Sequence, residues 1–261
     1  LLVGDIGASV ARGAFQGERE AVLERAHEAG VERMVITGAD EAGSRAALDL
    51  ARRYSDRFRA TAGVHPHVAA EASPKIIDTL RGLAEHPLVV SIGEAGLDFH
   101  RDLSPRDAQE RLFERQLELA AETGLPVFAH QRDAHDRFME ILRPWRAHLS
   151  GIVVHCFTGT EAELDDYLAL DCHVGITGWI CDERRGHHLR EFVHRIPSDR
   201  LMVETDAPYL LPRDLDPKPR SRRNEPMYLP HIVETLARAR GEDPETCAAA
   251  TTATARRFFG F

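Results

Sequence analysis

Residues 89–131 read VVSIGEAGLDFHRDLSPRDAQERLFERQLELAAETGLPVFAHQ, and their pattern decides the fold. An apolar run at 89–93 is followed by a segment of helical periodicity, and a second apolar run covers 127–131. Short runs rich in Val, Ile and Leu that alternate with amphipathic helices are typical of strands buried in a parallel sheet. The segment therefore predicts a strand–helix–strand unit.

The same alternation runs through the whole chain. Ser104 as N-cap and Pro105 as the first helical residue predict the start of the helix in this unit, and Gly124 predicts its end. Eight repeats favour a closed barrel over a doubly wound sheet. We therefore predict an α/β fold, a single-domain (β/α)8 TIM barrel over residues 1–261. The expected strands are Leu1–Gly7, Arg33–Gly38, Phe58–Gly63, Val89–Gly93, Val127–Gln131, Gly151–Phe157, Cys172–Thr177 and Leu201–Asp206.

Composition excludes several classes of protein. A net charge of -9 argues against a protein that coats duplex DNA through a broad basic surface. The sequence has no apolar run of about 18 residues and no signal-peptide pattern, so we expect a cytoplasmic protein without a membrane segment. The four cysteines form no C-x-x-C pair and are expected to be reduced thiols.

Histidines and acids stand at the ends of five predicted strands. Functional groups of a (β/α)8 barrel project from these carboxyl ends. Taken singly, such a residue is more often a hydrogen-bonded structural His or a helix N-cap. Together they would converge on one small volume, where a divalent ion offsets their desolvation and repulsion. The residues are His65 with His67, Glu94, His130, His155 and Asp206.

We expect Glu94, His130, His155 and Asp206 to bind the metal, as in a metallo-dependent hydrolase, with Asp206 and Glu94 catalytic. Two imidazoles and two carboxylates suit Zn, Mn, Fe or Ni and are less typical of Mg. Neither of the two lysines closes a predicted strand, so a carboxylated-lysine bridge between two metals is not expected.

Arginines gather in two loops that follow the last two predicted strands. Arg184 and Arg185 lie in the first loop, and Arg222 and Arg223 lie in the second. Alone, each run is expected to be a solvated charge cluster. Beside a metal site, a phosphate-binding rim is the better account. We add Arg132 to this predicted substrate-binding set.

Several motifs resemble the TatD family of metal-dependent deoxyribonucleases over essentially the whole chain. The later motifs resemble the branch that gives the family its name. The motifs are Ala62–His67, Ile92–Phe99, His130–His135, His155–Gly159, Gly175–Trp179, Cys181–Gly186, Glu204–Arg213 and Ser221–Pro226.

The resemblance implies a cytoplasmic 3′–5′ exonuclease that degrades single-stranded DNA or RNA and takes part in DNA repair or DNA fragment degradation. It implies Mg²⁺ as cofactor, with Mn²⁺ or Zn²⁺ as alternatives. Glu94, His130 and His155 are then metal ligands, and Asp206 is a ligand or the catalytic base. We expect a monomer that takes nucleic-acid ends as substrate.

One motif departs from the family pattern. Many members begin with Asp-x-His-x-His or Asp-x-His-x-Asn, whose imidazoles hold a second metal, whereas this chain has Asp5-Ile6-Gly7-Ala8-Ser9. Gly7 offers no ligand and Ser9 only a weak one, which predicts a one-metal resting site. A second ion could still arrive with substrate phosphate. His65 and His67 could bind that phosphate, protonate the leaving group or be structural.

Two alternative functions remain open at this point. The same barrel could hydrolyse esters or amides, as in D-aminoacyl-tRNA deacylation. It could also be a binding protein that kept the fold without the activity.

Overall fold

The computed structural model describes residues 1–260. Its contacts divide the chain into two compact units. The central unit is residues 36–155, and the terminal unit is residues 1–35 with the chain from residue 156 onward. The expectation of one domain over 1–261 stays a prediction.

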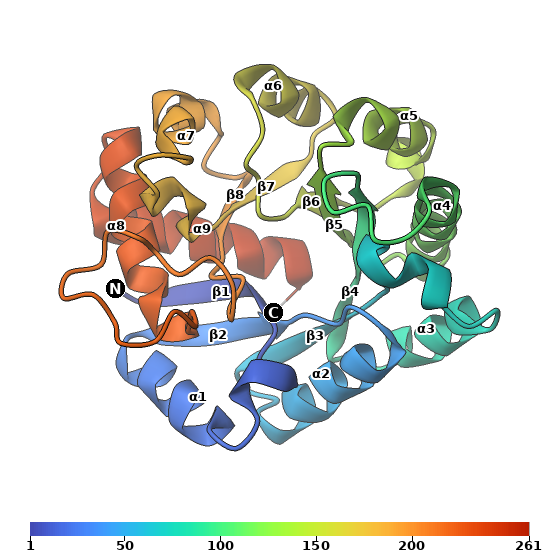
Figure 1. Ribbon diagram of the computed structural model, residues 1–261, viewed down its shortest axis with the longest axis horizontal. Coiled ribbons are helices and arrows are strands. Elements are labelled where there is room, and N and C mark those ends of the chain that lie inside the picture. Colours follow the sequence, from blue (N-terminus) through green and yellow to red (C-terminus); the bar gives the residue numbers. More distant parts are fainter. Residues whose placement is uncertain (261) are drawn as a thin grey trace. The chain divides into compact units, whose positions relative to one another are not determined.

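The central unit holds four parallel strands, β3 (Phe58–Ala62), β4 (Val89–Asp98), β5 (Val127–Arg132) and β6 (Ile152–Val154). Each pairs with the next along the chain. Figure 1 shows the helices that pack along these strands, which are α2 (Glu41–Arg53), α3 (Ile76–Ala84), α4 (Arg106–Thr123) and α5 (His135–Trp145). The unit also holds the short 3-10 helices η2 (Pro66–Glu71) and η3 (Arg146–His148). Buried Phe113 and Phe138 stack with ring centroids 4.9 Å apart and join α4 to α5.

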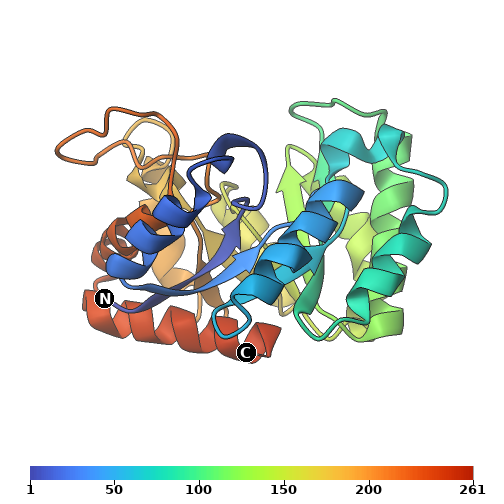
Figure 2. The same cartoon turned by 90° about the horizontal axis from the view of Figure 1, so that it is seen from below.

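The terminal unit holds β1 (Val3–Ala8), β7 (His173–Ile176), β8 (Leu201–Val203) and β2 (Val31–Ile36), whose last residue belongs to the central unit. β7 pairs in parallel with β8, and Ala8 bridges Ala207 in parallel. The helices are α1 (Arg19–Glu28), α6 (Glu161–Ala169), α7 (His187–Phe192), α8 (Leu229–Arg240) and α9 (Pro244–Phe259), with η1 (Gly13–Phe15), η4 (Gly178–Cys181), η5 (Val193–Arg195) and η6 (Pro226–Tyr228). Figure 2 shows the long α9 helix against β1 and β8, which it contacts directly.

The order of strands in the sheet follows the chain from β1 to β8. Parallel strands joined by helices in this order are the topology of a (β/α)8 fold. The predicted fold class is confirmed. Among residues 1–260, no helix is both long enough and apolar enough to cross a bilayer.

Strand β4 is the element that departs most from its predicted length. The expected strand ends at Gly93, but β4 continues to Asp98 because Gly96 pairs with His130 of β5. Gly96 has a φ of +153°, and an added Cβ would lie 1.8 Å from the His130 carbonyl oxygen. A glycine is therefore required for β4 to extend to Asp98.

The predicted N-cap of α4 is wrong. The helix begins at Arg106, after Pro105 as the capping residue, and makes no side-chain cap. Ser104 is buried, and its hydroxyl donates to the His67 carbonyl oxygen and accepts from the Ala70 amide instead. Gly124 does end the helix in the left-handed conformation, as predicted.

Gly96→Ala is expected to destabilise the protein by about 2–4 kcal/mol, because the new methyl group must displace the β5 backbone. Gly82→Ala in α3 is the matched control, since nothing lies within 4 Å of its added Cβ. There, removing a helical glycine is expected to stabilise by up to about 1 kcal/mol. Urea unfolding of both variants measures the difference, and equal midpoints would contradict the account of β4.

Candidate metal centre

Glu94 lies at an irregularity in β4. The register with β5 shifts between Gly93 and Ala95, so Glu94 falls in a bulge. Its amide donates to the carbonyl oxygen of Gly38 at 2.9 Å, and the residue is 7% exposed. A bulge re-aims a side chain and is common beside active sites. The backbone pairing of the bulge thus sets the direction of the buried Glu94 side chain.

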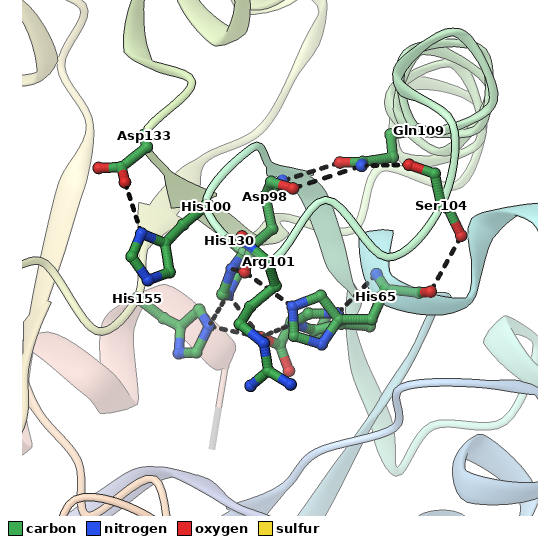
Figure 3. Close-up of polar contacts among 11 residues, drawn as sticks. His65, Asp98, His100, Arg101, Ser104, Gln109, His130, Asp133 and His155 are labelled. Atoms are coloured by element: carbon green, nitrogen blue, oxygen red, sulfur yellow. Dashed lines mark hydrogen bonds and ion pairs between the residues drawn. The ribbon is translucent and has the colours of Figure 1, made fainter.

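Three imidazole nitrogens surround one oxygen of this carboxylate. Glu94 Oε1 lies 2.6 Å from His155 Nε2, 3.0 Å from His130 Nδ1 and 3.3 Å from His65 Nε2. His130 Nδ1 and His155 Nε2 are 3.3 Å apart. Figure 3 shows the imidazoles of His65, His130 and His155 turned toward one another. We call Glu94, His65, His130 and His155 the imidazole cluster.

The histidines of the imidazole cluster keep the buried Glu94 carboxylate ionised. Burial raises the pKa of Glu94, but nearby His155 and His65 and the hydrogen bonds from His130 and His155 hold it well below its usual range. Burial lowers the pKa of His65 to about 4. Burial also acts to lower the pKa of His130, yet its bonds to Asp98 and Glu94 leave that pKa raised. A cation is therefore favoured beside Glu94.

Asp98 is the last residue of β4, and its carboxylate accepts hydrogen bonds from His67 and His130. Its Oδ2 lies 2.7 Å from His67 Nε2 and 3.1 Å from His130 Nε2, while its Oδ1 accepts from the Arg101 amide. The residue is buried, and these bonds depress the pKa of its carboxyl despite that burial. Figure 3 shows Asp98 between this pair and Gln109, whose Oε1 accepts from the Asp98 amide. Asp98 thus fixes the orientation of His130.

In the terminal unit, Asp206 follows β8 in a left-handed backbone conformation with a φ of +55°. Its amide donates to the Gly7 carbonyl oxygen at 2.9 Å. Buried Asp5 fixes the residue before it, accepting bonds from the Thr205 amide and hydroxyl. Burial raises the pKa of Asp5 to about 7, against those bonds, which favour the charged form. The stretch Asp5–Ser9 therefore supports the backbone of Asp206 through Asp5 and Gly7.

The predicted substrate-binding arginines have different surroundings. Arg184 and Arg222 are exposed. Arg185 pairs with buried Asp182 at 3.0 Å and lies over the Trp179 ring. The remaining two are more enclosed: half-buried Arg132 ends β5, and half-buried Arg223 pairs with Glu18 and Glu225. Substrate binding by these five stays a prediction, and the ion pairs of Arg223 give it a structural role as well.

The family model described as TatD related DNase matches residues 5–260. The chain belongs to the TatD family. Among its relatives is the 3′-5′ ssDNA/RNA exonuclease TatD of Erwinia amylovora, 54% identical over 256 residues, which are 98% of this chain and 99% of the relative. The protein of the same name from Salmonella typhimurium is 51% identical over 255 residues, 98% of each chain. The resemblance to the TatD family is confirmed.

A solved structure supports the same family and fold. The crystal structure of YJJV, a TatD homolog from Escherichia coli, is similar with a TM-score of 0.91 and 27% identity, over 99% of this chain and 98% of that one. The (β/α)8 class expected from the sequence therefore fits both the strand order and this TatD neighbour.

The structure brings together three of the four predicted ligands, Glu94, His130 and His155, within the central unit. It adds His65, because Glu94, His65 and His130 place ligand atoms within 4.8 Å of one another. Asp98 is the residue that sequence reasoning missed. Asp98 closes the run Ala95-Gly96-Leu97, which lies beyond the expected strand end at Gly93.

Proposed function

We propose that this chain is a metal-dependent 3′–5′ exonuclease that degrades single-stranded DNA and RNA. One observation carries the proposal: three imidazole nitrogens lie within 3.3 Å of a single buried carboxylate oxygen of Glu94. Relatives about half identical over nearly the full chain bear the name 3′-5′ ssDNA/RNA exonuclease TatD, which supports the substrate and the polarity.

The donor set fits a divalent ion. Glu94, His130 and His155 are the proposed ligands, and Asp206 is the proposed fourth ligand or the catalytic base. Mg²⁺ is the proposed cofactor, and the imidazoles leave Mn²⁺ and Zn²⁺ as alternatives that the donor set suits better. When bound, the ion supplies positive charge that lowers the pKa of the attacking water and offsets charge on the phosphate.

The side chains of the chain prepare this chemistry. Asp98 accepts a hydrogen bond from His130 Nε2, which turns His130 Nδ1 toward Glu94. In the proposed reaction Asp206 orients or deprotonates the water, while Arg132, Arg184, Arg185, Arg222 and Arg223 bind the phosphates of the substrate strand. His65 and His67 are placed to bind the scissile phosphate or to protonate the leaving oxygen.

The cellular setting follows from this activity. We propose that a monomer acts in the cytoplasm on single-stranded ends, in DNA repair or in the degradation of DNA fragments. Survival after DNA damage tests this setting. It is measured in a deletion strain and in a strain that carries the Glu94→Gln variant, each against its parent.

A side-by-side assay separates the proposed nuclease from its rivals. The purified protein with Mg²⁺ or Mn²⁺ is given a labelled single-stranded oligonucleotide and, separately, a D-aminoacyl-tRNA. We expect mononucleotides from the first and no deacylation of the second. Deacylation without nucleotide release favours the ester hydrolase, and turnover of neither favours a binding protein.

Asp98→Asn is expected to weaken activating-metal affinity by about 10–100-fold, since loss of a carboxylate behind a ligating His has this effect. The neutral side-chain amide of Asn is a weaker acceptor for His67 and His130 than the Asp98 carboxylate. Asp133→Asn is the matched control, because Asp133 is exposed and pairs with exposed His100, as Figure 3 shows. The metal concentration for half-maximal activity is the measurement, and an unchanged value in Asp98→Asn would contradict the positioning role.

A further inference from the structure

A second group of metal-binding side chains lies in the terminal unit. Cys181 ends η4, Asp214 lies in the loop after β8, and His231 lies in the first turn of α8. Their ligand atoms lie within 4.8 Å of one another, and His231 Nε2 is 2.7 Å from Asp214 Oδ1. η4 packs on α8, which brings the thiol to the histidine. We call these three residues the thiol cluster.

A buried hydroxyl beside the thiol cluster has only a weak hydrogen-bonding neighbour. Thr235 is one helical turn beyond His231 on α8 and is only 3% exposed. Its Oγ1 interacts with the Cys181 thiol and, within residues 1–260, has no other hydrogen-bond partner. A thiol is a weak hydrogen-bonding group, so a water held at the thiol cluster would be a better partner for this buried hydroxyl.

We propose that Cys181 Sγ, the Asp214 carboxylate and His231 Nε2 bind a Zn²⁺ ion, with a water as fourth ligand that bonds to Thr235. A thiolate with an imidazole and a carboxylate is a zinc donor set, and Mg²⁺ does not select thiolates. The set differs in kind from the imidazole cluster, which contains no sulfur. Binding exchanges the thiol proton, which goes to solvent, for the ion.

The ion would tie together the two arginine-bearing loops. Asp182, next to Cys181, pairs with Arg185 of its own loop and with Arg213 of the other. Asp214, the next residue after Arg213, belongs to the thiol cluster. Zinc at this point therefore joins the loop with Arg184 and Arg185 to the loop that leads to Arg222 and to helix α8. The role is structural, and it stands whether or not those arginines bind phosphate.

Cobalt substitution tests the thiol cluster. The full-length protein, stripped of metal and kept reduced, is titrated with Co²⁺ while the thiolate-to-cobalt charge-transfer absorption is followed. In the wild type, Cys156→Ser and Cys247→Ser, we expect the intensity of this band to correspond to one thiolate-bound Co²⁺ per chain. We expect the band to be absent in Cys181→Ser. The proposed catalytic centre has only nitrogen and oxygen donors, so its ion gives no such band and failure of one proposal leaves the other intact.

His231→Gln provides a second variant that keeps the thiol. We expect its Co²⁺ affinity, read from the same band, to fall at least tenfold, as for loss of one ligand. Zn²⁺ should raise the thermal midpoint of the wild type by more than that of His231→Gln, because the variant keeps the imidazole cluster but loses a ligand of the thiol cluster. A wild type without a thiolate band, or a band that persists in Cys181→Ser, would overturn the proposal and leave a hydrogen-bonded cluster only.

Discussion

Glu94→Gln is expected to reduce mononucleotide release from a single-stranded oligonucleotide by about 10³-fold or more, because the metal supplies several kcal/mol of transition-state charge stabilisation. Glutamine has nearly the same shape, so the bulge in β4 should survive. It removes the charge that Glu94 Oε1 presents to His65, His130 and His155. Bound metal should fall with activity.

The control for this variant is Glu140→Gln in α5. Glu140 is 65% exposed and pairs with Arg137 at 2.8 Å on the helix surface. An exposed ion pair of this kind contributes little to stability, so both activity and metal content should stay near wild type. Retention of activity in Glu94→Gln, with a folded protein confirmed by circular dichroism, would contradict the placement of the catalytic ion.

Asp206→Asn is expected to cost about 10³-fold or more in the rate of hydrolysis, since the variant loses either a metal ligand or the group that orients the attacking water. Asparagine is the suitable substitution because Asp206 has a φ of +55°, a conformation that Asn tolerates better than Ala does. Metal content separates the two roles. A catalytic base leaves it unchanged, whereas a ligand lowers it.

Asp171→Asn controls for the backbone conformation of Asp206. Asp171 has a φ of +56°, is exposed, and pairs with Arg200. Its replacement should leave hydrolysis unchanged. Equal activities of Asp206→Asn and the wild type would remove Asp206 from the mechanism.

The βα alternation was sufficient to predict the (β/α)8 class, because strand runs and helix ends are local signals. Strand ends were predicted less well. Strands β6 and β8 end at Val154 and Val203, short of the expected Phe157 and Asp206. The chain leaves the sheet there at Cys156 and Asp206, whose positive φ angles depend on tertiary contacts and leave no mark in composition.

The residue types at the strand ends were sufficient to predict part of the candidate site. The rest depends on pairing between residues that are far apart in the sequence. Glu94, His130 and His155 were predicted as neighbours because parallel strands bring their carboxyl ends together. The role of Asp98 was not predictable, since it requires Gly96 to let β4 pass close to His130. The roles of Thr235 and Ser104 likewise depend on contacts between elements distant in the chain.

The most direct measurement of the central claim is a digestion ladder. Two single-stranded oligonucleotides, one labelled at the 5′ end and one at the 3′ end, are incubated with the protein and Mg²⁺, with and without chelator. The account predicts a shrinking ladder from the 5′-labelled strand, immediate release of labelled mononucleotide from the 3′-labelled strand, and loss of both with chelator and in Glu94→Gln. Undiminished digestion in the presence of chelator, or intact strands with every divalent metal supplied, would contradict it.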